Sequence, residues 1–254
     1  LQHALLTARR AGAPLTEALV LNSLSQAQQS RGRFEEAWEN AQLSIELLRE
    51  GNHAYHLALA LTNLGYLAED RGQLALSGDL HREALDIRTA YGFERQIAAS
   101  QYGLARVERR SGKLAAAAER VATAADVMLQ TGQRLDRISA LEELAVVERL
   151  RGRFEASERA LDQAEDLARA MDDGLGVAWL MDVRGRLRMA EGRPDAAVPL
   201  LRESSQPQRQ HGEVHEARYT QLALLDALRR VHSPRAHDGP TASRAEKVEM
   251  AELE

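Results

Sequence analysis

Two closely spaced histidine pairs could contribute ligands to a metal ion. His53 and His56 are three residues apart, and His211 and His215 are four apart, so each pair can share one face of a helix. A protein metal site needs further ligands, and the spacing fixes no third histidine or carboxylate beside either pair. The chain also has no cysteine. We therefore expect no metal ion and no cofactor, and we expect these histidines at exposed helix starts.

Residue patterns typical of catalysis are also missing. The sequence has no glycine-rich nucleotide-binding loop, no Gly-x-Ser-x-Gly nucleophile motif and no His-Glu-x-x-His zinc motif. Adjacent acidic residues occur at Glu142 with Glu143 and at Asp172 with Asp173. In a chain with 28% charged residues, such pairs are typical of solvated helix faces. We predict that the chain is not an enzyme and has no catalytic residues.

Composition narrows the remaining classes of function. The 254 residues include 33 Lys and Arg against 38 Asp and Glu, a net charge of −5. That balance argues against nucleic-acid binding and against attachment to a membrane surface. No apolar run is built to cross a membrane, and the first residues do not form a signal peptide. We expect a cytoplasmic protein, and a piece of a longer polypeptide because Leu1 falls inside a helical pattern.

A glycine repeat sets the architecture. Glycine recurs every 40 residues, and a second series lies 20 residues out of phase, in which Asn and Asp are the two exceptions. These residue types tolerate a positive φ, which commonly ends a helix. The pattern predicts alternating helices and turns. The first series is Gly32, Gly72, Gly112, Gly152 and Gly192, and the second is Gly12, Asn52, Gly92, Gly132, Asp172 and Gly212.

The helices of the two half-repeats differ in a regular way. We call the helix before each glycine of the first series an A helix, and the helix after it a B helix. A leucine column predicts the buried stripe of the A helices, and only Ala or Ser occupies two columns of the B helices, so the paired backbones can approach closely. The leucines are Leu24, Leu64, Leu104, Leu144 and Leu224. The small residues are Ala37, Ser77, Ala117, Ser157, Ala197 and Ser44, Ala84, Ala124, Ala164, Ser204.

This pattern resembles the tetratricopeptide repeat family. The resemblance rests on Leu64-Gly65 in an A helix, on the turn glycines, on Phe34 or Phe154 two residues after the turn, and on the small columns. The 40-residue period is longer than the usual value of about 34. Repeats of this length are similar to those of kinesin light chains and of the C-terminal regions of large bacterial transcription activators.

The resemblance implies an all-α fold, a right-handed α-solenoid of antiparallel helix pairs with five full repeats and partial terminal repeats. We assign residues 1–10 to the last helix of a truncated repeat, 11–231 to the array, and 232–254 to a polar linker with a possible short helix. The sequence pattern of the repeats becomes less regular towards the end of the array. Arg184 replaces a column leucine, and Pro199 and Pro207 are expected to interrupt the fifth B helix.

In this family the A helices line the concave surface, which implies a binding face here. Counted from the leucine column, which Arg184 occupies in the fifth A helix, that face takes the positions −5, −2, −1, +2 and +5 of each A helix. Four of the ten aromatic residues fall in these columns, and they either anchor a partner or cover the ridges between repeats. A near-neutral groove of Arg, Tyr, Asn and Gln suits an extended acidic or C-terminal peptide better than DNA. The candidate residues are Asn22, Asn63, Tyr66, Tyr102, Arg106, Arg109, Glu142, Arg149, Trp179 and Arg186.

We therefore predict a non-catalytic scaffold or sensor that binds a protein, a peptide or a neighbouring domain of the same chain. The resemblance places it within a larger bacterial transcriptional regulator or signalling protein. The alternative is an intracellular receptor of the peptide-pheromone type, in which the groove is an allosteric ligand site. An enzyme remains possible only if an upstream segment carries an ATPase or kinase domain. The sequence leaves the oligomeric state open.

Overall fold

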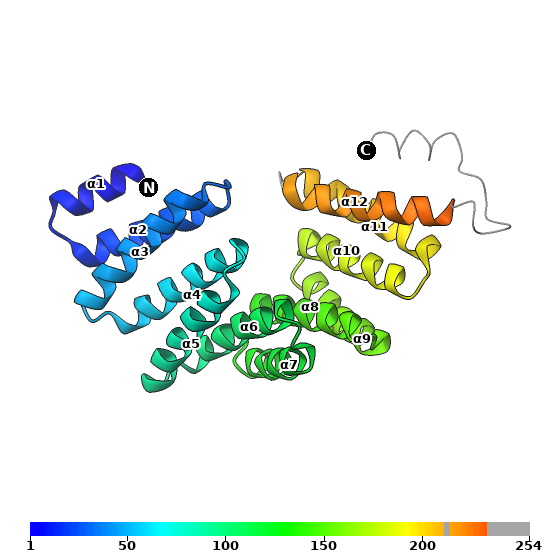
Figure 1. Ribbon diagram of the computed structural model, residues 1–254, viewed down its shortest axis with the longest axis horizontal. Coiled ribbons are helices and arrows are strands. Elements are labelled where there is room, and N and C mark those ends of the chain that lie inside the picture. Colours follow the sequence, from blue (N-terminus) through cyan, green and yellow to red (C-terminus); the bar gives the residue numbers. More distant parts are fainter. Residues whose placement is uncertain (211–213, 233–254) are drawn as a thin grey trace. The chain divides into compact units, whose positions relative to one another are not determined.

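The computed structural model describes residues 1–210 and 214–232, which form twelve α-helices and no strand (Figure 1). Side chains are described for residues 1–205 and 218–232. The chain divides into two compact units, Leu1–Gln133 and Arg134–Glu254. Unit 1 contains α1 (Gln2–Arg10), α2 (Pro14–Gln29), α3 (Phe34–Glu50), α4 (Ala54–Asp70), α5 (Leu74–Ala90), α6 (Glu94–Arg110) and α7 (Leu114–Gln130). Unit 2 contains α8 (Arg134–Leu150), α9 (Phe154–Arg169), α10 (Gly174–Ala190), α11 (Pro194–Gln210) and α12 (Val214–Val231).

Each described turn contains a residue with positive φ at the position that the glycine repeat predicts. Gly112 has φ +77°, and the next N–H, that of Lys113, donates 2.8 Å to the carbonyl of Glu108. This closure satisfies a carbonyl that the end of α6 would leave unpaired. Asn52 and Asp172 take the same conformation, with φ 55° and 53°. Gly212 lies outside the described residues. A helix of about 17 residues followed by a three-residue turn therefore generates the 20-residue half-repeat.

Within each unit, helices pack against their neighbours along the chain, and successive A helices also touch. The A helices are α2, α4 and α6 in unit 1, and α8, α10 and α12 in unit 2. All ten small B-helix residues are buried, as predicted. The hydroxyl of Ser44 donates 2.7 Å to the carbonyl of Ala18, and that of Ser157 donates 2.7 Å to the carbonyl of Ala145. The small columns thus hold each B helix against the backbone of the A helix facing it.

The small column of α7 gives a stability prediction. Ala117 has no exposed surface, so Ala117→Leu should overpack the contact with α6 and cost about 1–3 kcal/mol of unfolding free energy. Ala116→Leu, an exposed change on the same helix, is the matched control and should alter stability little. Urea denaturation followed by circular dichroism measures both. Equal stabilities of the two variants would contradict this packing.

The fifth B helix differs from the expectation. Helix α11 runs without a break from Pro194 to Gln210, so Pro199 and Pro207 do not interrupt it. The side chain of Pro199 is exposed, and its buried neighbours Val198 and Leu201 belong to an apolar cluster with α12. Proline removes one helical hydrogen bond, and burial of the flanking residues offsets that loss.

Ion pairs stabilise the arginine that replaces the column leucine in the fifth A helix. Arg184 of α10 lies against α9, where its guanidinium contacts Glu158 at 3.1 Å, Asp162 at 2.7 Å and Glu165 at 2.7 Å. Only 18% of the arginine side chain is exposed. Three carboxylates therefore fix a charged side chain at a position that is apolar in the other repeats.

The structure describes the first helix of the array but not the residues that follow His232. Helix α1 packs against α2, the first A helix. The polar linker and short helix assigned to 232–254 lie outside the described residues after His232. Across the part of the chain that the structure describes, no helix has both the length and the apolar character needed to span a bilayer.

Candidate functional site

In unit 1, two candidate amides connect neighbouring A helices. The side-chain N–H of Asn63 on α4 donates 3.1 Å to the side-chain oxygen of Asn22 on α2. Asn22 is only 7% exposed and Asn63 is half-buried. This hydrogen bond links α2 to α4, and Asn63 is the more accessible of the two amides.

The structure brings together three of the predicted residues of unit 1, Tyr66, Tyr102 and Arg106. The guanidinium of Arg106 lies 5.2 Å from the centre of the Tyr66 ring and 5.9 Å from that of Tyr102. The same arginine pairs with Glu69 at 3.0 Å, and Arg110 approaches the same carboxylate oxygen at 3.3 Å. Glu69 is 1% exposed. Arg106 is therefore held between two rings by a buried carboxylate.

Two further arginines were predicted to complete this patch. Arg109 is half-buried on α6, the helix that also carries Tyr102 and Arg106. Arg149 belongs to α8 of unit 2, and it is described with that unit. A patch that includes both arginines stays a prediction.

A buried histidine behind this cluster was not predicted from the sequence. The ring of His81 on α5 is fully buried, and it lies edge-on to Tyr66 with ring centres 4.9 Å apart. A Cβ atom added at Gly65 or Gly103 would meet the ring at 2.9 Å or 2.5 Å, so glycine is required on both A helices. Neither ring nitrogen has a hydrogen-bond partner in the protein. Burial, with smaller contributions from Arg106 and Arg88, lowers the pKa of His81 to about 4.

The sequence did hold a signal for this histidine. His81 occupies a B-helix column whose other members are all apolar and fully buried. A histidine is unusual in a buried apolar column, and two glycines in the middle of the facing A helices leave room for its ring. Together these features could have identified His81 from the sequence. The other members are Ala41, Val121, Leu161 and Leu201.

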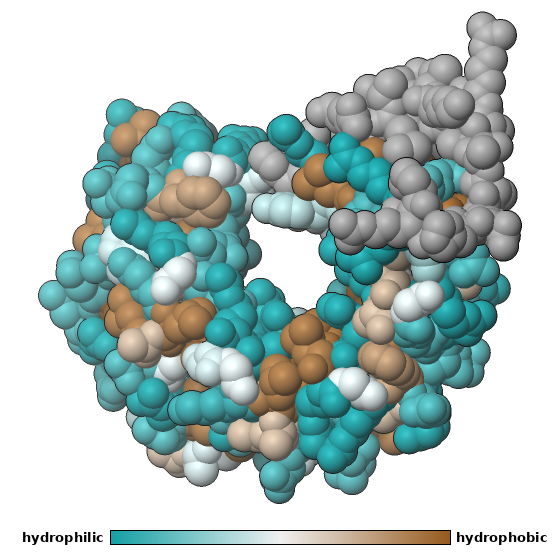
Figure 2. All heavy atoms as spheres, turned by 45° about the vertical axis from the view of Figure 1, so that its right-hand side comes forward, coloured by the Kyte–Doolittle hydropathy of each residue, from teal (hydrophilic) through white to brown (hydrophobic). Residues whose placement is uncertain are grey.

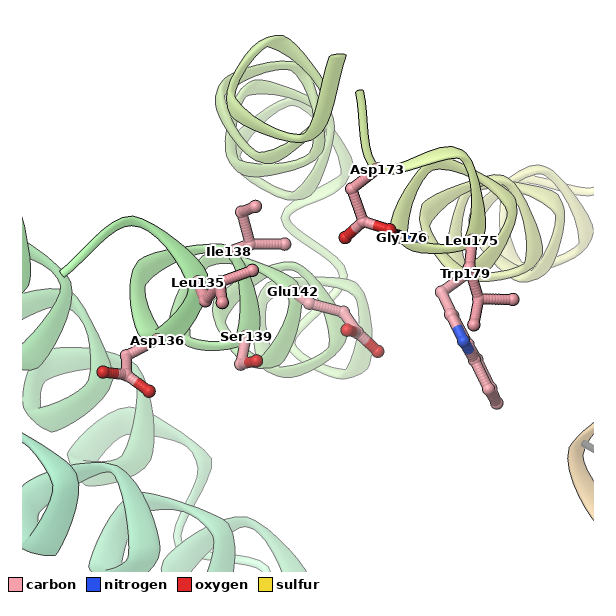
Figure 3. A pocket seen from close by; sticks show the side chains of 9 residues that line it. All are labelled: Leu135, Asp136, Ile138, Ser139, Glu142, Asp173, Leu175, Gly176 and Trp179. Carbon is pink, nitrogen blue, oxygen red and sulfur yellow. Dashed lines mark hydrogen bonds between the residues drawn. The ribbon is translucent and has the colours of Figure 1, made fainter. Parts of the chain in front are cut away.

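In unit 2, a pocket of about 300 Å³ opens between the N-terminal halves of α8 and α10 (Figure 3). We call it the acidic pocket because its charged lining residues, Asp136, Glu142 and Asp173, are all carboxylates. The carboxylate of Glu142 points into the space between the helices, and Trp179 projects from α10 towards the same opening. The remaining lining residues are Leu135, Ile138, Ser139, Leu175 and Gly176. Such a lining can accept a cation with an apolar stem.

The first turn of α10 shapes one wall of the acidic pocket. Asp173 is the N-cap residue, and its carboxylate accepts a 2.8 Å hydrogen bond from the N–H of Gly176. A Cβ atom at Gly176 would lie 2.3 Å from the other carboxylate oxygen. A side chain at position 176 would therefore require the capping carboxylate to move. Glu143, which was expected on a solvated face, is only 7% exposed.

A second pocket, of about 460 Å³, lies between α10 and α12. We call it the arginine pocket. Arg186 pairs with Asp182 at 2.7 Å and also donates 3.1 Å to the carbonyl of Tyr219, and Arg230 pairs with Asp226 at 3.0 Å. The lining residues are Arg149, Arg186, Met189, Ala190, Tyr219, Leu222, Ala223, Asp226 and Arg230. Guanidinium groups beside apolar side chains can hold a carboxylate and an apolar residue together.

The histidine pair at His53 and His56 is less exposed than the sequence predicted. His53 and His56 are half-buried rather than exposed, and the His56 ring packs edge-on against Tyr55 with centres 5.3 Å apart. The side chains of His211 and His215 lie outside the described ones. Among the residues described, no three potential metal ligands gather at one point.

The surface carries its apolar side chains in small groups. Figure 2 shows a mostly hydrophilic face on which the hydrophobic residues form separate patches. In unit 2, Tyr219 is 67% exposed and Leu222 is 51% exposed, and both line the arginine pocket. Exposed apolar residues beside a pocket are typical of a binding surface.

Paired helices in a 40-residue repeat, with positive-φ turns and small buried columns, define a helical-repeat protein of the tetratricopeptide type. Residues 136–206 match the tetratricopeptide repeat family model, in agreement with the resemblance found in the sequence. Comparison with curated protein sequences gives no match.

Solved structures agree on the fold. A putative kinesin light chain from Podosopora anserina with nearly identical TPR-like repeats is 18% identical and has a TM-score of 0.61, over 79% of this chain and 98% of that one. Aspartyl phosphate phosphatase F from Bacillus subtilis is 9% identical, with a TM-score of 0.72 over 94% of this chain and 60% of that one. A Rap protein complexed with competence and sporulation factor is 12% identical, with a TM-score of 0.65 over 94% and 66%. At these identities the likeness shows the fold alone.

Proposed function

We propose that the chain is a non-catalytic scaffold or sensor that binds a protein or peptide segment on the face of its A helices. One observation carries the proposal. The acidic pocket and the arginine pocket both open between successive A helices, and seven of the nine residues that line the arginine pocket come from the columns predicted for the binding face. Grooves of this kind, lined by arginine and exposed aromatic residues, are typical of peptide-binding surfaces.

The ten candidate residues divide between the units. In unit 2, Glu142 and Trp179 belong to the acidic pocket, and Arg149 and Arg186 belong to the arginine pocket. In unit 1 we propose that the partner contacts the accessible edges of the cluster that Tyr66, Tyr102 and Arg106 form. The unit 1 residues are Asn22, Asn63, Tyr66, Tyr102, Arg106 and Arg109.

We further propose that the chain acts in the cytoplasm, within a larger bacterial transcriptional regulator or signalling protein. A net charge of −5 favours a protein or peptide partner over nucleic acid. The second candidate is a receptor for a peptide signal. The fold shared with a Rap protein complexed with competence and sporulation factor favours it.

Trp179 allows a direct test. Dodecapeptides selected from a random display library on the immobilised chain should bind with an affinity that Trp179→Ala lowers at least tenfold, because a central aromatic anchor contributes more than about 1.4 kcal/mol. The chain has only two tryptophans, so in a Trp38→Phe background Trp179 alone reports binding by a change in emission. Tyr91→Ala, at an exposed aromatic residue of unit 1, is the control. A library that yields no binder, or binders indifferent to Trp179, contradicts the proposal.

A further inference from the structure

Arg88 of α5 is the one arginine that is buried in the part of the chain that the structure describes. It is 3% exposed, and it occupies a B-helix column in which the other members with described side chains are apolar and buried. A guanidinium at such a position loses its hydration, and that loss costs free energy unless the charge is compensated. The other members are Leu48, Met128 and Ala168.

Neutral groups supply the contacts of this guanidinium. Nη1 donates 2.5 Å to the hydroxyl of Ser100 on α6, and Nη2 donates 3.4 Å to the carbonyl of Ala58 on α4. No carboxylate of the described residues forms an ion pair with it. Burial lowers the pKa of Arg88, and the groups that oppose this shift are two tyrosines, Tyr66 and Tyr55, rather than carboxylates. The positive charge therefore lacks a counter-charge among the described residues.

Two arginines of α10 show how the chain compensates a guanidinium between helices. Arg184, which also stands at an apolar position, has an 18% exposed side chain and contacts three carboxylates at 2.7 to 3.1 Å. Arg188 pairs with Glu158 at 2.7 Å and with Glu191 at 3.0 Å. Arg88 is more deeply buried than either, and it has no such partner. The comparison indicates that its counter-charge comes from outside the chain.

Helix ends offset only part of the charge of Arg88. It lies in the last turn of α5, where the unpaired carbonyls amount to about half a negative charge. Its contacts Ala58 and Ser100 belong to the second turns of α4 and α6, and the starts of these helices carry partial positive charge. An excess of positive charge therefore remains between the three helices.

His81 adds a second incompletely bonded group to the same space. It precedes Arg88 by seven residues on α5, which is two helical turns, so both side chains lie on the face that packs between α4 and α6. Neither ring nitrogen of His81 has a hydrogen-bond partner in the protein, and the charge of Arg88 contributes to its lowered pKa. Buried polar groups are normally hydrogen-bonded. Two such residues side by side point to a ligand that accepts hydrogen bonds.

The remaining N–H groups of Arg88 define what can bind there. A guanidinium has five N–H groups, and the two hydrogen bonds to Ser100 and Ala58 use two of them. Three donors are left in a planar fork. Paired N–H groups of this kind match the two oxygens of a carboxylate.

We propose that Arg88 binds a small monovalent carboxylate between α4, α5 and α6. One negative charge neutralises one guanidinium, whereas a doubly charged phosphate would leave a buried negative charge in excess. At 3% exposure the guanidinium admits a small free ion rather than a side chain of a folded partner. The ion enters beside Tyr55, which is 45% exposed and precedes Ala58 by three residues on the same side of α4. The site belongs to unit 1 and does not depend on the proposed function.

Urea denaturation with sodium acetate as the probe tests this inference. In a Trp179→Phe background, Trp38 is the only tryptophan, and its emission follows the unfolding of unit 1. Acetate should raise the urea midpoint in a saturable manner, because a ligand that binds only the folded chain stabilises it. Sodium chloride and sodium phosphate at the same ionic strength should raise the midpoint less.

Three variants assign the response to Arg88. Arg88→Met removes the charge and introduces a side chain that the same column already holds at Met128, so it should fold, be at least as stable as the wild type without acetate, and show no saturable response. Arg88→Lys keeps the charge without the paired N–H groups and should weaken acetate binding at least tenfold. Arg82→Met, at an exposed arginine of the same helix, is the charge-matched control and should keep the full response.

Line broadening of the acetate methyl signal in proton NMR measures binding to the folded protein directly. The wild type and Arg82→Met should broaden the signal, and Arg88→Met should not. Equal midpoint shifts in the wild type and Arg88→Met, or broadening that persists in Arg88→Met, would overturn the inference. A response to phosphate or chloride as large as that to acetate would overturn the choice of a carboxylate. Each of these results leaves the peptide-binding proposal, which Trp179 tests, unaffected.

Discussion

Replacing Arg106 by alanine should lower the unfolding free energy of unit 1 by about 3 kcal/mol. Glu69 is 1% exposed, so removal of Arg106 leaves a buried carboxylate with less compensation, a change that costs about 3–5 kcal/mol when a pair is broken. Arg110 remains 3.3 Å from the same oxygen, which places the expected value at the lower end of that range. Loss of the contacts with the rings of Tyr66 and Tyr102 adds to the effect.

The measurement can be confined to unit 1. In a Trp179→Phe background, Trp38 is the only tryptophan, and its emission follows the unfolding of unit 1 in urea. Arg95→Ala, an exposed arginine on the same helix, is the control and should alter stability by less than about 0.5 kcal/mol. With Glu69 replaced by Gln, Arg106→Ala should cost only about 1 kcal/mol, because no buried charge is left behind. An equal cost in both backgrounds would show that the ion pair is not the cause.

This result bears on how the binding face should be probed. Arg106 is a candidate contact for a partner, and it is also part of the packing between α4 and α6. A loss of binding in Arg106→Ala would therefore mix two effects. Trp179 lines an open pocket, and its substitution separates binding from stability more cleanly.

The fold could be predicted because its determinants are local and repeated. Each turn needs a residue that tolerates positive φ, and Gly112, Asn52 and Asp172 supply it at fixed intervals. The small B-helix columns likewise predict which face of each B helix is buried, since the space at Ala117 and its equivalents admits only small residues. The predicted interruption of α11 at Pro199 was wrong. Val198 and Leu201 are buried against α12, and this packing stabilises α11, which the local sequence does not reveal.

The candidate site could be predicted only in part. Column positions place Tyr66, Tyr102 and Arg106 on one face, and the structure brings them together. The partner of Arg106 could not be found this way, because Glu69 lies 37 residues away and the pairing depends on how neighbouring repeats stack. The pockets depend on the same stacking, because each is formed between two A helices.

Acidification should destabilise unit 1 through His81. Its pKa falls from an unfolded value of 6.5 to about 4 in the folded chain, so below pH 6.5 the unfolded state binds a proton that the folded state does not. Stability from this residue is complete above pH 6.5 and is lost as the pH falls towards 4. The loss is about 2 kcal/mol at pH 5 and about 3 kcal/mol at pH 4, at 1.36 kcal/mol per pH unit. Urea denaturation between pH 7 and 4, read by Trp38 emission in the Trp179→Phe background, measures it.

His81→Leu isolates this contribution from the titration of the carboxylates. Leucine already fills the same column at Leu201, where a Cβ atom on the facing Gly185 would lie 2.7 Å from the leucine side chain. The variant should therefore fold, and neither nitrogen of His81 loses a hydrogen bond to the protein. Between pH 7 and 5 it should lose about 2 kcal/mol less stability than the wild type, whereas His3→Leu, at an exposed histidine, should follow the wild-type profile. Parallel profiles for wild type and His81→Leu would mean that His81 carries no part of the acid response. The carboxylates would then account for all of it.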